Sequence, residues 1–371
     1  MGDAVSGAMN ILVDIAHPAH VHFFRNFMRA MEERGHRVLV SARDKEVTLA
    51  LLRTYGFPYH LRGEVRKGIA RKALDLFSID YRLLALARKF RPDILIGIHN
   101  PYIAHVAKLL GKPSVIFTDT ENVGVASLLT YPFATAICTP SCFRESIDPR
   151  KHVRYNGFKE LAYLHPRYFT PDPAVLGQMG FARDEPFIVA RFISWSASHD
   201  LRLRGIAPGT EEGFLQALEG EGRVVLTSER PLPPGLEKYR LRVPPEMMHT
   251  LLAFARLYIG EGGTMATEAA VLGTPAIHIE ATREGHASGE ESGNFLELRD
   301  RYGLVNFYPD QESALAKALE ILGDNTSRET FRARRDRLLV DKTDVTVWMT
   351  DFIEGFPESF RKYRADSGKG G

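Results

Sequence analysis

The chain has 371 residues, of which 44% are hydrophobic and 25% are charged, and its formal net charge is +2. This length favours two domains, and the composition is typical of a globular protein. The near balance of charge argues against nucleic acid as a partner. No run of 18 apolar residues occurs, so we expect no membrane-spanning helix. Two cysteines cannot form a disulfide framework. Residues 1–8 are expected to be a flexible extension and lack the features of a secretion signal. Both observations lead us to expect a cytoplasmic protein.

Short apolar runs alternate with helical patterns along the first half of the chain. In chain order, strands are expected at 10–15, 36–41, 93–98, 113–117, 134–138 and 152–155. Helices are expected between them at 21–34, 47–55, 69–90 and 101–110. This alternation predicts βα units and a parallel sheet.

The alternation weakens between Gly157 and Glu185, where three prolines cluster, and then resumes. Strands are expected at 187–191, 223–227, 257–259 and 275–279, and helices at 213–218, 245–254, 264–272, 290–302, 313–322, 329–339 and 345–354. We therefore predict an α/β protein of two Rossmann-like, doubly wound domains facing across a cleft. The first domain covers 9–165 and the second 166–342, and the helix and tail over 343–371 either close the second domain or cross back to the first.

A glycine turn in the second half joins an expected strand directly to a helix. The segment runs Gly260-Glu261-Gly262-Gly263-Thr264, with Glu268 inside the helix. Backbone N–H groups and the positive end of a helix dipole at such a turn bind anions. The carboxylate of Glu268 would accept hydrogen bonds from the hydroxyls of a ribose while phosphates lie on the turn. An ordinary strand–turn–helix junction with a solvated Glu268 is the alternative.

This segment resembles the nucleotide-sugar motif of GT-B-fold glycosyltransferases, and also that of the UDP-N-acetylglucosamine 2-epimerases. The resemblance implies that Gly262, Gly263 and Thr264 contact a diphosphate and that Glu268 binds the ribose. It also implies contacts to the donor sugar from the segment that holds Glu280, Arg283 and Glu284. The whole chain resembles an uncharacterised prokaryotic family of this fold, through the motifs His17-Pro18-Ala19-His20, Gly157-Phe158-Lys159-Glu160 and Ser198-His199-Asp200.

A polar loop follows the first strand of the second domain. Arg191 would neutralise a phosphate there, and Ser194 and Ser196 would donate hydrogen bonds to it. His199 and Asp200, in the same loop, are further candidates for the donor sugar.

Histidines and acids follow the strands of the first domain. His17, His20 and His22 lie at the first strand-to-helix turn, and neutral histidine can take a proton from an attacking hydroxyl. We expect His20, and then His17, to be the base, whereas His22 more simply packs or caps. Further candidates leave the next strand ends, where parallel strands bring their loops together. These are His99, Asp119 and Glu121.

Several motifs do not occur in the sequence. It contains no Asp-x-Asp, no Walker A sequence and no Gly-x-Gly-x-x-Gly after the first strand, so we expect no bound metal and no cofactor. The leading hypothesis is an inverting, metal-independent glycosyltransferase that uses a UDP- or dTDP-type sugar and a glycan or lipid-linked acceptor. A nucleotide-sugar 2-epimerase and a non-catalytic nucleotide-sugar-binding protein are the alternatives.

A basic, amphipathic stretch covers residues 62–91. It contains nine Lys or Arg residues and three acids, interleaved with apolar residues. Such a segment can rest on an anionic membrane surface, which predicts a possible peripheral contact at the inner face of the membrane. A solvated helix face is the simpler alternative.

Overall fold

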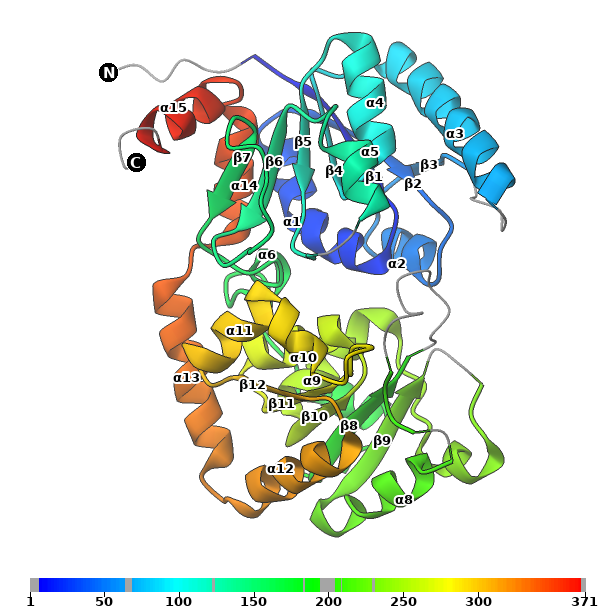
Figure 1. Cartoon of the computed structure of the whole chain (residues 1–371), viewed down its shortest axis with the longest axis vertical. Helices are drawn as coiled ribbons and strands as arrows, with labels where there is room; N and C mark the ends of the chain where they lie inside the picture. The colour runs from blue at the N-terminus through cyan, green and yellow to red at the C-terminus, as the bar shows by residue number, and fades with distance from the viewer. Residues whose placement is uncertain are drawn as a thin grey trace. The chain divides into compact units, whose positions relative to one another are not determined.

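The computed structural model describes residues 7–63, 69–121, 124–182, 184–193, 204–207, 209–228 and 231–367, and the side chains of all of these except 69–76 and 367. The chain divides into two compact units (Figure 1). Unit 1 comprises Met1–Tyr163 together with Thr343–Gly371, and unit 2 comprises Leu164–Lys342. The 343–371 segment therefore belongs to unit 1.

Unit 1 is built on a seven-stranded sheet with all strands parallel, in the order β3-β2-β1-β4-β5-β6-β7. Its strands are β1 (Asn10–Ile15), β2 (Arg37–Ala42), β3 (Tyr59–Leu61), β4 (Ile94–Ile98), β5 (Ser114–Phe117), β6 (Ala136–Pro140) and β7 (His152–Tyr155). Its helices are α1 (Pro18–Glu33), α2 (Thr48–Thr54), α3 (Ile69–Phe90), α4 (Pro101–Leu110), α5 (Val125–Thr130), α14 (Val345–Glu354) and α15 (Glu358–Ser367), and α6 (Leu161–Leu164) lies at the boundary between the units.

Unit 2 has a five-stranded parallel sheet in the order β12-β11-β10-β8-β9. Its strands are β8 (Phe187–Phe192), β9 (Arg223–Ser228), β10 (Leu257–Gly260), β11 (Ala276–Ile279) and β12 (Val305–Tyr308). Its α-helices are α7 (Ala174–Gln178), α8 (Glu211–Gln216), α9 (Met248–Phe254), α10 (Gly263–Leu272), α11 (Gly293–Asp300), α12 (Gln311–Gly323) and α13 (Ser327–Asp341). Short 3-10 turns lie at Glu219–Glu221, Pro234–Tyr239, Pro245–Met247 and Ser288–Glu291.

Both parallel sheets with flanking helices agree with the predicted α/β class, and several predicted boundaries need correction. The first helix begins at Pro18 and not at residue 21, because His17 caps it and proline suits the first helical position. The helix predicted over 290–302 is a 3-10 turn followed by α11, because Ser292 caps a new helix. The helix predicted over 245–254 likewise begins as a 3-10 turn, after Pro244.

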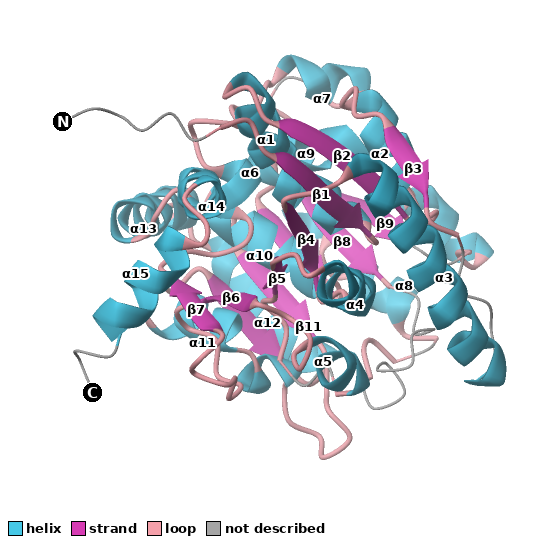
Figure 2. Ribbon diagram, turned by 90° about the horizontal axis from the view of Figure 1, so that it is seen from above, coloured by secondary structure: helices cyan, strands magenta, loops and turns pink. Residues whose placement is uncertain are grey.

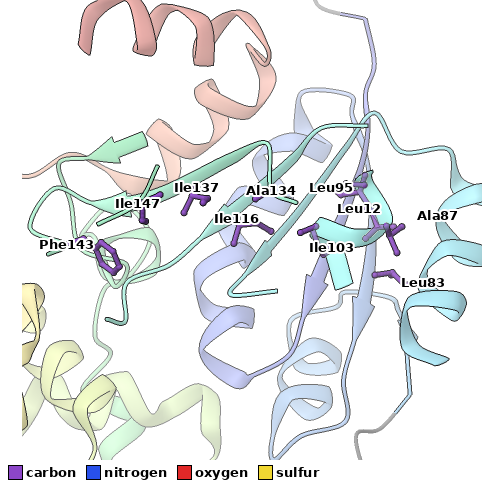
Figure 3. Close-up of a cluster of buried hydrophobic side chains, with 13 residues drawn as sticks. Leu12, Leu83, Ala87, Leu95, Ile103, Ile116, Ala134, Ile137, Phe143 and Ile147 are labelled. Carbon is purple, nitrogen blue, oxygen red and sulfur yellow. The ribbon is translucent and has the colours of Figure 1, made fainter. Parts of the chain in front are cut away.

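The core of unit 1 lies on both faces of its sheet. On one face, α3 and α4 pack over apolar side chains of β1, β4, β5 and β6 (Figure 3), and the two helices run side by side in Figure 2. On the other face, Phe23 and Phe24 of α1 meet Phe117 edge to face. Trp348 of α14 contacts the same Phe117 ring, so the returning segment completes this face of the core.

A buried ion pair lies at the carboxyl end of β1. Asp14 is fully buried, and its Oδ1 lies 3.4 Å from Nε of Arg62, which follows β3. Asn100 donates a hydrogen bond to the other Asp14 oxygen and also caps α4 by accepting from the Ile103 N–H at 3.1 Å. Asp14 therefore connects the ends of β3, β1 and β4.

Among the described residues, no helix is both long enough and apolar enough to cross a bilayer.

Replacing Asp14 by Ala is expected to lower the free energy of unfolding by about 3 kcal/mol, because it leaves Arg62 buried without its counter-charge. With Trp195 replaced by Phe, the remaining tryptophan, Trp348, reports on unit 1 in a urea titration. Arg150→Ala, which breaks an exposed pair with Asp148, is the control and should barely move the midpoint. Equal effects of the two changes would contradict a structural role for the buried pair.

Candidate functional site

The strand order of each sheet reverses once, and the polar residues gather at these reversals. In unit 1 the reversal lies between β1 and β4, and in unit 2 it lies between β8 and β10. Loops on the two sides of such a point leave the sheet in opposite directions, which opens a crevice at the carboxyl ends of the strands. The structure thus defines one candidate edge in each unit.

The edge of unit 1 holds His17 and His20. His17 caps α1, since its Nδ1 accepts a hydrogen bond from the Ala19 N–H at 3.2 Å, and its Nε2 lies 3.8 Å from Glu46. His20 lies in the first turn of the helix, with its ring centroid 5.9 Å from that of His17. Burial holds the pKa of His20 well below its usual value, and the positive charges of His17, Lys159 and Arg62 lower it further. His20 is therefore neutral at physiological pH, and its Nδ1 accepts a hydrogen bond from the Ala16 N–H at 3.4 Å.

His22, two residues further along α1, faces the core. It is buried, it stacks on Tyr163 with a centroid distance of 5.4 Å, and it lies 3.5 Å from the hydroxyl of Tyr55. His22 therefore packs, as its place in the helix indicated.

His99 follows β4 in a left-handed backbone conformation, with φ of 42°. Non-glycine residues with this conformation are uncommon and concentrate at functional sites. Its Nδ1 lies 2.7 Å from the Thr118 hydroxyl, and its Nε2 lies 3.3 Å from that of Ser127. Burial lowers the pKa of His99 to about 4, although the charge of Asp119 acts in the opposite direction.

Asp119 and Glu121 follow β5 and have separate partners. The Asp119 carboxylate forms an ion pair of 2.7 Å with Nζ of Lys159, which also lies 3.8 Å from Glu160. Glu121 accepts a hydrogen bond from the Arg144 N–H at 3.2 Å. Lys159 is the cation that the sequence analysis left without a role: its charge acts on both Asp119 and His20. Lys159 belongs to the motif Gly157-Phe158-Lys159-Glu160, and this motif is the sequence feature that could have identified it as a site residue.

The edge of unit 2 is organised by Glu261, which is 1% exposed. Its two carboxylate oxygens accept hydrogen bonds of 2.9 Å from the N–H groups of Ile193 and Ile206. Its own N–H donates to the Arg191 carbonyl oxygen. A Cβ at Gly260 would collide with that same carbonyl oxygen, so this position requires glycine. Glu261 thus binds the two loops at the reversal, although the sequence analysis treated it only as part of the turn.

The glycine turn leaves the start of α10 open. Gly262 is the N-cap residue, and no side chain in the described part of unit 2 caps the helix. A Cβ on Gly262 would lie 3.2 Å from Cγ of Arg191, so glycine lets the arginine side chain pass beside the turn. Thr264 is exposed in the first turn. Among the described residues, N–H groups without a side-chain cap and a helix dipole therefore lie at this turn, beside the Arg191 side chain, and this arrangement suits an anion.

Glu268 is 5% exposed and has a histidine beside it. Nε2 of His249, in α9, lies 3.0 Å from its Oε1. This contact joins α9 to α10 and fixes the orientation of the carboxylate. From the sequence, the segment Pro244–Leu252 that holds His249 resembles the short helix that frames the base, but its contact with Glu268, 19 residues away, was not predicted.

The remaining candidates for the donor sugar differ in exposure. Glu280 is half-buried, with its Oε1 3.7 Å from Nε2 of His278, while Arg283 and Glu284 are exposed. Glu284, His286 and Glu291 offer ligand atoms within 4.8 Å of one another, the one such metal-competent group in the described part of the chain, and all three are exposed. Four candidates lie outside the described residues, namely Ser194, Ser196, His199 and Asp200.

Comparison with known proteins gives the family. A family model described as a protein of unknown function, DUF354, matches residues 9–283. The chain belongs to the DUF354 family. An uncharacterised protein of Methanocaldococcus jannaschii is 25% identical over 278 residues, which are 72% of this chain and 81% of that protein.

Solved structures give the fold. A putative UDP-N-acetylglucosamine 2-epimerase from Listeria monocytogenes matches with a TM-score of 0.65 at 13% identity, covering 95% of this chain and 97% of that one. MnaA of S. aureus, solved with UDP, matches at 0.67 and 9% identity, covering 95% and 97%. Spinosyn rhamnosyltransferase, complexed with thymidine diphosphate, matches at 0.60 and 16% identity, covering 92% and 99%. The predicted GT-B fold and the resemblance to an uncharacterised family of this fold are confirmed.

The low pKa of His99 gives a prediction for stability. Between about pH 4 and 6.5 the unfolded chain takes up a proton at this residue and the folded chain does not, so stability falls as the pH drops through this range. The contribution lost is about 3 kcal/mol by pH 4, from a pKa difference of about 2.5 units. His99→Gln should therefore lose less stability than the wild type between pH 7 and 4.5, measured by urea unfolding. In NMR, the ring signal that disappears in His99→Gln should not titrate above pH 5.5, and a midpoint near 6.5 would refute the prediction.

Proposed function

We propose that the protein transfers a glycosyl group from a nucleoside-diphosphate sugar to a glycan or lipid-linked acceptor. The observation that carries this proposal is the open start of α10 at the strand reversal of unit 2, with Arg191 beside it and the Glu268 carboxylate held within the same helix. The fold is that of enzymes solved with UDP and with thymidine diphosphate, which supports a UDP- or dTDP-type donor.

In this proposal unit 2 binds the donor. The diphosphate lies on the N–H groups at Gly263 and Thr264, and Arg191 neutralises its charge. Glu268 accepts hydrogen bonds from the ribose hydroxyls. Glu280, Arg283 and Glu284, with His199 and Asp200, are assigned to the sugar. The positive groups matter most as the diphosphate leaves, because its negative charge grows in the transition state.

Unit 1 supplies the base. The oxygen of an acceptor hydroxyl attacks the anomeric carbon, and the bond from that carbon to the donor phosphate breaks with its electron pair leaving on the diphosphate. His20 takes the hydroxyl proton, since it is neutral and lies at the strand reversal. Direct displacement of this kind inverts the configuration and needs no metal ion. His17, His99, Asp119 and Glu121 are proposed to position the acceptor and this base.

A nucleotide-sugar 2-epimerase is the second candidate. It is favoured by the Listeria structure, a putative enzyme of that type. That chemistry requires paired acids and a histidine around the sugar ring, and we assign these roles to His199, Asp200, Glu280 and Glu284. A protein that binds the nucleotide sugar without turnover is the third possibility.

Glu268→Gln is expected to weaken binding of UDP or thymidine diphosphate about tenfold, because it removes the charge from the hydrogen-bond acceptor of the ribose. Isothermal titration calorimetry on the full chain measures this. Glu320→Gln, an exposed residue of α12 that pairs with Lys317, is the matched control and should bind like the wild type. Unchanged affinity in Glu268→Gln would remove the proposed nucleotide site.

Product analysis separates the three candidates. Incubation with the preferred nucleotide sugar and candidate acceptors should release the nucleoside diphosphate only when an acceptor is present, and His20→Asn should keep donor binding while losing this release. An isomerised sugar without acceptor would establish epimerisation. Tight binding with neither product would establish a binding protein.

We also propose that unit 1 contacts a membrane surface when the acceptor is lipid-linked, which would place the protein at the inner face of the membrane. His105 of α4 connects three helices. Its Nδ1 lies 2.9 Å from Oδ2 of Asp80 in α3, and its Nε2 lies 2.9 Å from the carbonyl oxygen of Leu129 in α5. Large apolar side chains are exposed on the same helices: Phe77, Tyr81, Leu109, Val125 and Leu128. Exposed basic residues accompany them, including Arg88, Lys89, Lys108 and Lys112. Apolar insertion combined with positive charge is typical of peripheral membrane proteins.

Leu128→Asp, at a side chain that is 74% exposed, should reduce co-sedimentation with vesicles containing anionic lipid by about fivefold, because it places a charge in the apolar surface. Val340→Asp, at an 86% exposed position of unit 2, is the matched control and should leave binding unchanged. Binding that neither variant alters would show that this surface does not contact the membrane.

A further inference from the structure

Two arginines lie side by side at the carboxyl ends of β2 and β3 in unit 1. The register pairs Ala42 with Leu61, and the Arg62 N–H donates to the Ala42 carbonyl oxygen at 3.1 Å, so the residues that follow, Arg43 and Arg62, are also neighbours. Neighbouring positions of parallel strands direct their side chains to the same face of a sheet. The side chains of Arg43 and Arg62 therefore leave one face, and their like charges repel each other.

A third arginine reaches this place from α3. A Cβ at Gly63, the residue after Arg62, would lie 2.7 Å from Nη1 of Arg82. The Arg82 guanidinium thus packs against the backbone beside Arg62, where glycine leaves room for it. We call Arg43, Arg62 and Arg82 the arginine cluster.

The arginine cluster has one acidic partner in the part of the chain that the structure describes. Asp14 lies 3.4 Å from Nε of Arg62. No hydrogen bond or ion pair joins the guanidinium group of Arg43 or of Arg82 to another described residue. Three cations thus share one carboxylate, and that carboxylate is fully buried on the Arg62 side of the cluster.

Other acids of this region do not compensate the charge. Glu46 lies 3.2 Å from Nζ of Lys45, and Asp80 lies 2.9 Å from Nδ1 of His105. Asp44 is exposed and forms no ion pair within the described ranges. The arginine cluster therefore keeps an excess of positive charge, which favours the binding of an anion.

Hydrogen-bond donors of the cluster are accessible to such an anion. Arg43 is half-buried, and only its Nε belongs to the buried atoms without a partner, so its two Nη groups reach solvent. Tyr102, in the first turn of α4, lies with its ring 4.5 Å from the guanidinium carbon of Arg62. Its hydroxyl is also outside the buried atoms and has no partner among the described residues. Burial raises the pKa of Tyr102 while the charges of Arg62 and Arg43 act to lower it, so both cations lie near this hydroxyl.

The cluster lies beside the proposed base. The Arg43 N–H donates to the Ile15 carbonyl oxygen at 2.9 Å, at the end of the strand that leads to His20. Burial lowers the pKa of His20, and the charge of Arg62 adds to this effect, after those of His17 and Lys159. A molecule that places a hydroxyl at His20 can therefore place a second, anionic group at the arginine cluster.

We propose that the arginine cluster binds a phosphate group of the acceptor. Phosphate oxygens accept hydrogen bonds from the Nη groups of Arg43 and from the Tyr102 hydroxyl, and the charges of Arg62 and Arg82 stabilise the second negative charge. A carboxylate has fewer oxygens and a single charge, so it matches this set of donors and cations less well. The assignment to the acceptor rests on the proposed transferase function, whereas the binding of phosphate at the cluster does not.

Inorganic phosphate is the probe, titrated into the full chain in the presence of saturating UDP, which occupies the proposed nucleotide site. With isotope-labelled arginine, the Nε–H signal that disappears in Arg43→Gln should shift with phosphate until the site is saturated. In calorimetry under the same conditions, Arg43→Gln should weaken phosphate binding about tenfold, because it removes a charged donor. Arg82→Gln, at an exposed position where the fold does not depend on the side chain, should weaken it about threefold through the lost charge.

Arg37→Gln is the matched control, since Arg37 is exposed at the amino end of the same strand, β2, and should bind phosphate like the wild type. An Arg43 signal that phosphate does not shift to saturation, or equal affinity in wild type, Arg43→Gln and Arg82→Gln, would overturn the proposal. The Arg43 signal reports on the cluster whether or not UDP binds, so a failed nucleotide site leaves this titration intact.

The role of the acceptor is tested by the transfer reaction. Arg43→Gln should raise the KM of the acceptor about tenfold more than the KM of the nucleotide sugar, because the arginine contacts only the acceptor. A larger rise in the KM of the nucleotide sugar, or an unchanged KM of the acceptor in a variant that no longer binds phosphate, would refute the assignment of this site to the acceptor.

Discussion

Two buried carboxylates, one in each sheet, hold the loops at the places where the strand order reverses. Asp14 joins the ends of β1, β3 and β4 through Arg62 and Asn100, and Glu261 joins the loop after β8 to Ile206 through both of its oxygens. A strand reversal leaves its two loops without a helix between them, so their positions depend on such contacts. Each carboxylate contacts partners from chain segments that only the fold brings together: an ion pair and one hydrogen bond for Asp14, and two backbone hydrogen bonds for Glu261.

The two edges use charge differently. In unit 1, cations surround a histidine that burial keeps neutral, and the acids there are committed to Lys159 and to backbone donors. In unit 2, the positive character comes from the backbone at the start of α10 and from Arg191, and the acids are held by N–H groups or by His249. One edge therefore holds a neutral histidine among cations, and the other is arranged to receive an anion.

The sequence predicted the elements whose pattern is local. The helix at Pro101–Leu110 was predicted to the residue, because proline starts it and Gly111 ends it in the left-handed conformation that favours glycine. The strands Tyr59–Leu61 and Val305–Tyr308 were missed, since one is three residues long and partly exposed and the other is four residues long with alternating exposure. The turn at Gly262 was predicted for a similar reason, because consecutive glycines between a strand and a helix are a local signal.

The partners of the site residues were not visible, because each is distant in the chain. Ile193 lies 68 residues from Glu261, and Asn100 lies 86 residues from Asp14. No spacing rule links such positions, and their pairing follows from the strand order. Lys159 was quoted within a motif but without its link to Asp119, which only the packing of the loops after β5 and β7 supplies.

Unit 2 is an insertion within unit 1, and its two connections to unit 1 are side by side. The Thr343 N–H donates a hydrogen bond to the Asn156 carbonyl oxygen at 2.8 Å. The Thr346 hydroxyl donates one to the Ala162 carbonyl oxygen at 2.7 Å. Trp348 then packs on Tyr155 and Phe352. On the ribosome, the first 163 residues emerge long before the segment that covers their aromatic core, whereas unit 2 emerges as one continuous stretch. The nascent chain can therefore complete its second unit before its first, and one face of the first stays open until the segment from Thr343 onward has been synthesised.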